Sequence, residues 1–125
     1  MIYFTDSHEW IEVDGEVGKV GITAYAKKEL GEIVYLEFPL EGKKVKAGDE
    51  IFILESTKAA ADIYTPVSGE ILTVNTSLRE SLSPLNHFPE TTGWLFTIHL
   101  SHPEELYGLM TSDQYRQSFS ADFSS

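Results

Sequence analysis

The chain contains no cysteine, and this absence excludes several classes of function at once. Structural disulfides, a cysteine nucleophile, iron–sulfur ligation and the common zinc sites all depend on cysteine sulfur. Any thiol chemistry must therefore come from a group that the chain binds. The sequence also lacks an apolar run near the roughly 20 residues that span a bilayer, and residues 1–12 carry neither a secretory signal nor a transit peptide. We therefore expect a cytoplasmic protein that does not associate with membranes.

Basic residues are scarce. Nine Lys and Arg residues face 20 Asp and Glu residues, which gives a net charge of −11 at pH 7. Such a surface repels nucleic acid and anionic lipid and favours basic faces of protein partners. It also opposes self-association, so a monomer is expected.

The length of 125 residues leaves room for one domain, and 42% hydrophobic residues are enough to form its core. We assign residues 1–119 to this domain and residues 120–125 to a flexible tail.

Most of the chain is typical of short strands separated by Gly, Pro, Asn and Ser. Asp14-Gly15 predicts the turn of a first hairpin. Thr23 and Gly31 are placed to cap the two ends of a short helix. The apolar run at residues 51–54 indicates a strand buried on both faces. The predicted strands are residues 8–13, 16–22, 33–38, 51–54, 59–64, 70–74 and 94–100.

The remaining segments are less regular. Residues 75–89 form a long irregular passage with room for one helical turn. Ser101 and Pro103 open a helical segment, and Ser112 is placed to cap a second one that carries Tyr115 and Phe119.

Three weak patterns carry no function. Gly15, Gly18 and Gly21 lack the strand–helix context of a phosphate-binding loop. His99 and His102 have no nearby ligand at metal-binding spacing, and no serine stands in a nucleophile elbow. We therefore predict no catalytic residue and no metal site.

The informative segment is Glu55-Ser56-Thr57-Lys58-Ala59-Ala60, between two predicted strands. It predicts a tight hairpin with one lysine at its tip. Most lysines are simply solvated surface residues. Here, however, small residues flank Lys58, so an enzyme could grip the tip, and the apolar strands would fix the direction of the side chain.

These residues resemble the lipoyl attachment segment of the glycine cleavage H-protein family, and the likeness extends over nearly the whole chain. The matching residues are Glu55, Ser56, Lys58, Ala59, Asp62, Pro66, Val67, Ser68, Gly69, Glu70, Ser7-His8-Glu9-Trp10, Val20-Gly21-Ile22-Thr23, Leu30-Gly31, Asn75, Gly93-Trp94 and Pro103-Glu104-Glu105-Leu106.

The resemblance implies a mainly β fold, the barrel-sandwich hybrid of lipoyl and biotinyl domains, with short peripheral helices and a helical C-terminus. It implies lipoate attached to Lys58 through an amide. The function implied is a non-catalytic shuttle in the bacterial cytoplasm, which carries an aminomethyl group from glycine decarboxylase to aminomethyltransferase. Dihydrolipoamide dehydrogenase would reoxidise the arm, and a lipoate ligase or lipoyl/octanoyl transferase would attach it.

The resemblance also assigns roles to residues around Lys58. Glu55, Ser56, Ala59 and Gly69 would set the turn and its recognition by the ligase. Glu9 and Asp62 would hold the cationic aminomethyl group, because carboxylates stabilise an amine in a sheltered cleft.

The chain departs from the family pattern at several positions. Glu90 and Thr91 replace a Tyr-Gly pair, and Thr57, Leu82 and Thr97 replace the usual Val, Pro and Lys. Three other functions therefore stay open: a lipoyl or octanoyl relay to other lipoyl domains or processes, a biotinyl carrier, and an unmodified interaction barrel. Thr57 and Ala59 disfavour biotin, whose sites have methionines beside the lysine.

Overall fold

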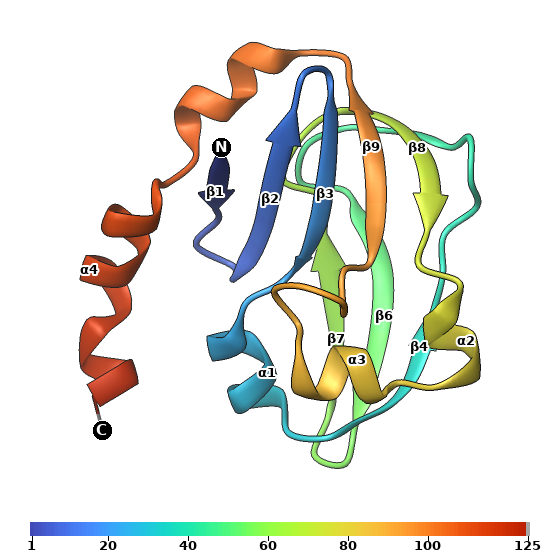
Figure 1. Ribbon diagram of the computed structural model, residues 1–125, viewed down its shortest axis with the longest axis vertical. Coiled ribbons are helices and arrows are strands. Elements are labelled where there is room, and N and C mark those ends of the chain that lie inside the picture. The colour runs from blue at the N-terminus through green and yellow to red at the C-terminus, as the bar shows by residue number, and fades with distance from the viewer. Residues whose placement is uncertain (125) are drawn as a thin grey trace.

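The computed structural model describes residues 1–124, with side chains for residues 1–119, as two antiparallel β-sheets with helices at their margins (Figure 1). The larger sheet has the order β1-β2-β3-β9-β8-β5, and the smaller has the order β4-β6-β7. This arrangement agrees with the expected barrel-sandwich fold. The strands are β1 (Ile2–Phe4), β2 (Glu9–Asp14), β3 (Val17–Ile22), β4 (Ile33–Glu37), β5 (Lys44–Val45), β6 (Glu50–Ser56), β7 (Ala60–Tyr64), β8 (Gly69–Val74) and β9 (Phe96–Leu100).

The first hairpin joins β2 and β3 as expected, but its turn lies one residue later than predicted. Asp14 pairs with Val17, so Gly15 and Glu16 form the loop. Gly15 has a φ of 64°, a conformation that glycine adopts without a steric cost.

The main core lies between the two sheets, with Phe52, Leu54, Ile71, Phe96 and Ile98 among its most buried residues. The prediction that residues 51–54 are buried on both faces is wrong, because the Ile53 side chain is 38% exposed. A register shift between Glu50 and Phe52 accompanies burial of the consecutive side chains Ile51 and Phe52. The bulge lets two consecutive apolar residues face the core, while Ile53 lies on the exposed outer face of β6.

The first helix, α1 (Ala24–Leu30), has both predicted caps. Thr23 Oγ1 accepts a hydrogen bond of 3.1 Å from the Ala26 amide, and Gly31 has a φ of 83°. Residues 75–89 form two short helices instead of one turn, α2 (Ser77–Glu80) and α3 (Ser83–His87). Each buries one leucine, Leu78 or Leu85, in the main core.

The C-terminal segment consists of a 3₁₀ helix, η1 (Pro103–Gly108), and the helix α4 (Ser112–Ser124), which is kinked at Phe119. α4 lies beside β1 at the margin of the larger sheet (Figure 1). The backbone of α4 extends to Ser124 and so includes most of residues 120–125, which were expected to form a tail. The side chains of residues 120–124, and all of Ser125, lie outside the described part of the chain. No helix in the described part of the chain is long and apolar enough to cross a membrane.

Candidate functional site

Lys58 lies at the tip of the β6–β7 hairpin with its side chain exposed. The Ser56 hydroxyl group organises this tip: its oxygen accepts hydrogen bonds from the Lys58 and Ala59 amides at 3.0 and 3.1 Å. The Ser56 amide donates to the Ala59 carbonyl at 2.8 Å and closes the loop. Within residues 1–119, Lys58 forms no ion pair. The geometry thus presents one primary amine on a short, well-bonded loop.

The tip is also tied to the end of α1. The Thr57 amide donates to the Glu32 carbonyl at 3.0 Å. The Lys58 stem passes Gly31, where a Cβ atom would lie 3.4 Å from Lys58 Cε. The C-terminal end of α1, at Gly31 and Glu32, therefore lies beside the Lys58 side chain, and we call it the Lys58 wall.

Glu9 is 2% exposed, which is unusual for a carboxylate. Its Oε1 atom accepts hydrogen bonds of 2.6 Å from both the Thr5 and Ser7 hydroxyl groups. Glu9 lines a groove of about 450 Å³, together with Tyr64 and Thr65 and the segment 108–110. The structure therefore holds an oriented carboxylate in the wall of a groove.

Asp62 is exposed on β7 and does not line this groove. Alternate residues of a strand face the same side, so Asp62 shares its face with Tyr64, which does line the groove. The side-chain face of β7 thus leads from the Lys58 loop past Asp62 to the groove that contains Glu9. Glu55 and Ala59 are exposed close to Lys58, and their predicted contact with a ligase stays a prediction.

Gly69 lies at the opposite end of β7 from Lys58, at the start of β8. A Cβ atom there would collide with the carbonyl oxygen of His99 on β9. This close approach is sufficient to require glycine. The predicted role of Gly69 in recognition by a ligase stays a prediction.

The weak patterns of the sequence have structural explanations. Gly18 and Gly21 leave space for the Ile11 and Trp10 side chains. His99 lies 3.2 Å from Glu16, and His102 lies 3.4 Å from Glu104. Among the residues whose side chains are described, no group of three His, Asp or Glu is arranged to hold a metal.

Four residues around the site were not singled out from the sequence for the contacts that they make. Thr5 and Ser7 precede Glu9 by four and two residues, and two hydroxyl groups so close to a carboxylate could have indicated that they bind it. Glu90, noted only as a departure, accepts the Ala24 amide at 2.6 Å and so caps α1. Tyr115 contacts Thr23 from 92 residues away, and no local pattern indicates that contact.

Burial raises the pKa of Tyr115 above its ordinary value of 10.0, and the hydrogen bond with Thr23 opposes this shift. The negative charges of Glu90 and Glu9 and the Tyr25 side chain raise it further. Tyr115 is therefore a neutral hydrogen-bonding group throughout the physiological range.

Comparison with known proteins identifies one family. The family model described as "Glycine cleavage H-protein" matches residues 2–122. The chain is 48% identical over 113 residues to the "Glycine cleavage system H protein" of Dinoroseobacter shibae, covering 90% of this chain and 93% of that protein. It is 47% identical over 112 residues to the protein of the same name from Caulobacter vibrioides, with 90% and 93% coverage. The crystal structure of a glycine cleavage system H protein from Mycobacterium marinum superposes with a TM-score of 0.86 at 30% identity, covering 95% of this chain and 96% of that one.

Proposed function

The chain belongs to the glycine cleavage H-protein family, and from this premise we propose that it carries an aminomethyl cargo on a lipoyl group attached to Lys58. The observation that carries the proposal is the Lys58 loop, where an exposed amine without an ion pair among residues 1–119 stands on a turn fixed by Ser56. When bound, lipoate supplies the thiol and disulfide chemistry that the cysteine-free chain lacks, and with it the redox and carrier function.

The residues of the loop fit an amide-linked group. The lysine stem is flexible, and its amine becomes neutral when it is acylated. Because Lys58 has no ion pair among the described residues, acylation removes no partner interaction. Glu55 and Ala59 beside it would be contacted by the ligase or transferase.

Glu9 and Asp62 are proposed to act on the cargo. A protonated amine that enters the groove meets the oriented Glu9 carboxylate, which the Thr5 and Ser7 hydroxyl groups hold in place. Charge-assisted hydrogen bonds of this kind are the strong ones, and a groove that excludes water protects a labile cargo. Asp62 would guide the arm along β7.

The proposed partners are glycine decarboxylase, aminomethyltransferase and dihydrolipoamide dehydrogenase, each of which acts on the arm, with this chain as a non-catalytic carrier. The net charge of −11 favours association with basic faces around their active sites. The bacterial relatives favour the bacterial cytoplasm as the compartment.

The test is the intact mass of the protein from its own cells, followed by peptide mapping. We expect one lipoyl group, on Lys58. Lys58→Arg retains the charge but offers no acylatable amine, so it should fold normally and carry no lipoate; lipoate on that variant would refute the assignment. Lys28→Arg, in the last turn of α1, is the matched control and should be modified like the wild type.

A second assay separates the carrier from the relay. The lipoylated protein is incubated with glycine and glycine decarboxylase, and uptake of the aminomethyl group is measured. Uptake supports the carrier function. No uptake, combined with donation of the lipoyl group to another carrier by a transferase, would establish the relay instead.

A further inference from the structure

The Tyr115 hydroxyl group joins the C-terminal helix to two segments that reach the candidate site from different directions. It lies 2.8 Å from His8 Nδ1 and 2.9 Å from Thr23 Oγ1, both within hydrogen-bond distance. The ring is 5% exposed and stacks on Phe4 with centroids 4.7 Å apart. One buried phenol on α4 thus contacts β1, the residue before β2 and the cap of α1.

The first partner controls the position of Glu9. His8 has a φ of 72°, a left-handed conformation that is costly for a residue with a side chain and must be held by its surroundings. It stands between Ser7 and Glu9, whose side chains hydrogen bond at 2.6 Å. A change in the His8 backbone would therefore change the direction of the Glu9 carboxylate.

The second partner controls α1. Thr23 caps this helix, and its amide donates to the His8 carbonyl at 3.0 Å, so both Tyr115 partners are also bonded to each other. The other end of α1 is Gly31, beside the Lys58 stem. The hydrogen bonds of Thr23 at the start of α1 therefore limit how far α1, including its end beside Lys58, can move.

The chain just before α4 contributes directly to the groove. Residues 108–110 line it together with Glu9 and Tyr64. Met110 is fixed to Phe4 by two backbone hydrogen bonds of 2.8 Å. The C-terminal segment therefore lines the groove with residues 108–110. Through Tyr115 it also contacts His8, next to Glu9, which lines the same groove.

We propose that Tyr115 is a positioning residue for the carrier site: its hydroxyl group fixes the Ser7–Glu9 segment and α1 relative to each other. The groove that contains Glu9 and the wall beside Lys58 then keep one relative geometry. The consequence for cargo rests on the proposed function, but the positioning itself does not.

The structural part is tested on the unmodified protein by amide hydrogen exchange. Tyr115→Phe keeps the ring on Phe4 and removes the hydroxyl group; Tyr107→Phe, at a 91% exposed side chain, is the matched control. We expect the Lys27 and Gly31 amides of α1 to exchange on the order of tenfold faster in Tyr115→Phe, with β8 and β9 unchanged. Unchanged α1 exchange, or an equal increase in α1 and in β8 and β9, would overturn the proposal.

A second pair of variants changes Thr23, the residue that hydrogen bonds with the Tyr115 hydroxyl group. Thr23→Ser keeps a hydroxyl group and should exchange like the wild type. Thr23→Val is similar in shape but loses both the cap on the Ala26 amide and the contact with Tyr115, so it should accelerate exchange in α1 more than Tyr115→Phe does. If the serine variant does not retain the slow exchange, the hydroxyl network is not the cause.

The functional part uses the lipoylated protein. In Tyr115→Phe, attachment of lipoate should proceed at the wild-type rate, whereas loss of the aminomethyl cargo to water should be several-fold faster. Cargo loss at the wild-type rate would show that Tyr115 does not position the site. If the wild type accepts no cargo, the proposed function fails, and the exchange experiment still decides the role of Tyr115.

Discussion

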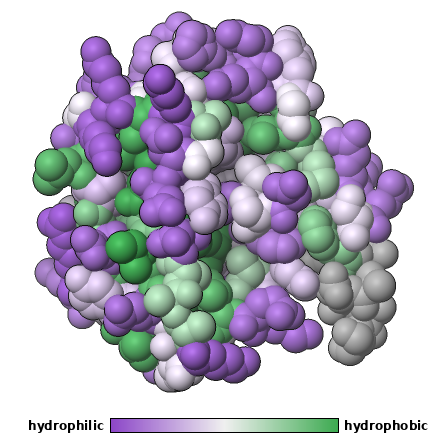
Figure 2. All heavy atoms as spheres, turned by 180° about the vertical axis from the view of Figure 1, so that it is seen from behind, coloured by the Kyte–Doolittle hydropathy of each residue, from purple (hydrophilic) through white to green (hydrophobic). Residues whose placement is uncertain are grey.

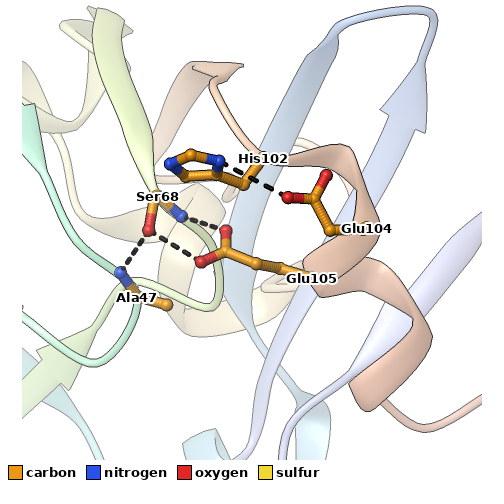
Figure 3. Close-up of polar contacts among 5 residues, drawn as sticks. All are labelled: Ala47, Ser68, His102, Glu104 and Glu105. Carbon is orange, nitrogen blue, oxygen red and sulfur yellow. Dashed lines mark hydrogen bonds and ion pairs between the residues drawn. The ribbon is translucent and has the colours of Figure 1, made fainter.

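The carboxylate of Glu105 on η1 accepts two hydrogen bonds from Ser68, at 2.7 Å from its amide and 2.8 Å from its hydroxyl group (Figure 3). Ser68 Oγ in turn accepts the Ala47 amide at 2.9 Å. Three segments far apart in the sequence therefore meet at one serine. This junction fixes the start of the C-terminal segment, whose later residues line the groove.

Replacing Glu105 by Ala should destabilise the protein, because it leaves the partly buried Ser68 amide without its acceptor. Hydrogen bonds to a charged group contribute about 1.5–3 kcal/mol, so we expect a loss of that order in the free energy of unfolding. Urea denaturation measures it. Glu104→Ala is the control: its partner His102 is exposed, and the expected change is below about 1 kcal/mol. Equal effects of the two variants would contradict the importance of the junction.

Gly69→Ala should be more damaging. The new Cβ atom meets the His99 backbone carbonyl, which cannot move without disturbing the pairing of β8 with β9. We expect a loss of about 3 kcal/mol or more in the free energy of unfolding, as for severe overpacking. Gly108→Ala is the control, because a Cβ atom there meets nothing within 4 Å and Gly108 has no positive φ. Lipoylation of the folded fraction then decides whether Gly69 also contributes to recognition by the ligase.

Helix caps and turn residues in the sequence were sufficient to predict the helices and hairpins that contain them. Thr23 and Gly31 bracket α1, and a strong turn signal marks the first hairpin. β1 and β5 were missed because three and two residues carry no periodicity, and tertiary pairing alone defines them. One helical turn was expected in residues 75–89 but two form, because each of α2 and α3 is a single turn whose buried leucine depends on the distant core.

For the site, the sequence predicted the exposed lysine on a hairpin tip, because both strands and the small residues are contiguous. It did not predict that Glu9 is buried, since this depends on the pairing of Glu9 with Ile22 of β3 and on the hydrogen bonds from Thr5 and Ser7. Tyr115 could not be predicted, because its partners are 92 and 107 residues away.

The raised pKa of Tyr115 predicts a specific loss of stability in alkaline solution. The unfolded chain ionises Tyr115 near pH 10, while the folded protein retains the proton to higher pH. The folded state then binds more protons, so stability is fully present below pH 10 and falls as the pH rises through the folded pKa. The wild type should therefore lose more stability than Tyr115→Phe above pH 10, as measured by thermal unfolding. Parallel curves for the two proteins would contradict the shift.

Glu90 accepts a hydrogen bond from the Ala24 amide and so caps α1. Glu90→Gln keeps an acceptor but removes a negative charge from the helix N-terminus, which typically costs about 0.3–1 kcal/mol. We expect modestly faster exchange of the Lys27 amide by hydrogen-exchange NMR. Glu80→Gln in α2 is the control and should leave α1 unchanged. A slower exchange in Glu90→Gln would show that the charge is unfavourable there.

Figure 2 shows the face of the molecule opposite to that of Figure 1, where hydrophilic residues surround scattered hydrophobic ones. Glu55 on β6 and Asp62 on β7 are exposed, and Asp62 pairs directly with the exposed Ile53. No Lys or Arg lies within β6 or β7. Neutralising Glu55 and Asp62 should therefore lower the rate of association with a basic partner more than it lowers the free energy of unfolding.

Separating the two carboxylates tests how the cargo is held. Glu9 is sheltered and oriented by two hydroxyl groups, so its charge should contribute about 1.5–3 kcal/mol to retention of a cationic amine, whereas exposed Asp62 should contribute less than about 1 kcal/mol. Glu9→Gln keeps the Oε1 acceptor for Thr5 and Ser7, which preserves the local fold while removing the charge. We therefore expect Glu9→Gln to accelerate loss of the aminomethyl group to water by at least roughly tenfold, and Asp62→Asn by only a few-fold, with attachment of lipoate unchanged in both. The measurement is release of formaldehyde and ammonia from the loaded protein. If Asp62→Asn has the larger effect, the cargo rests on the open face of β7 and not in the groove that contains Glu9.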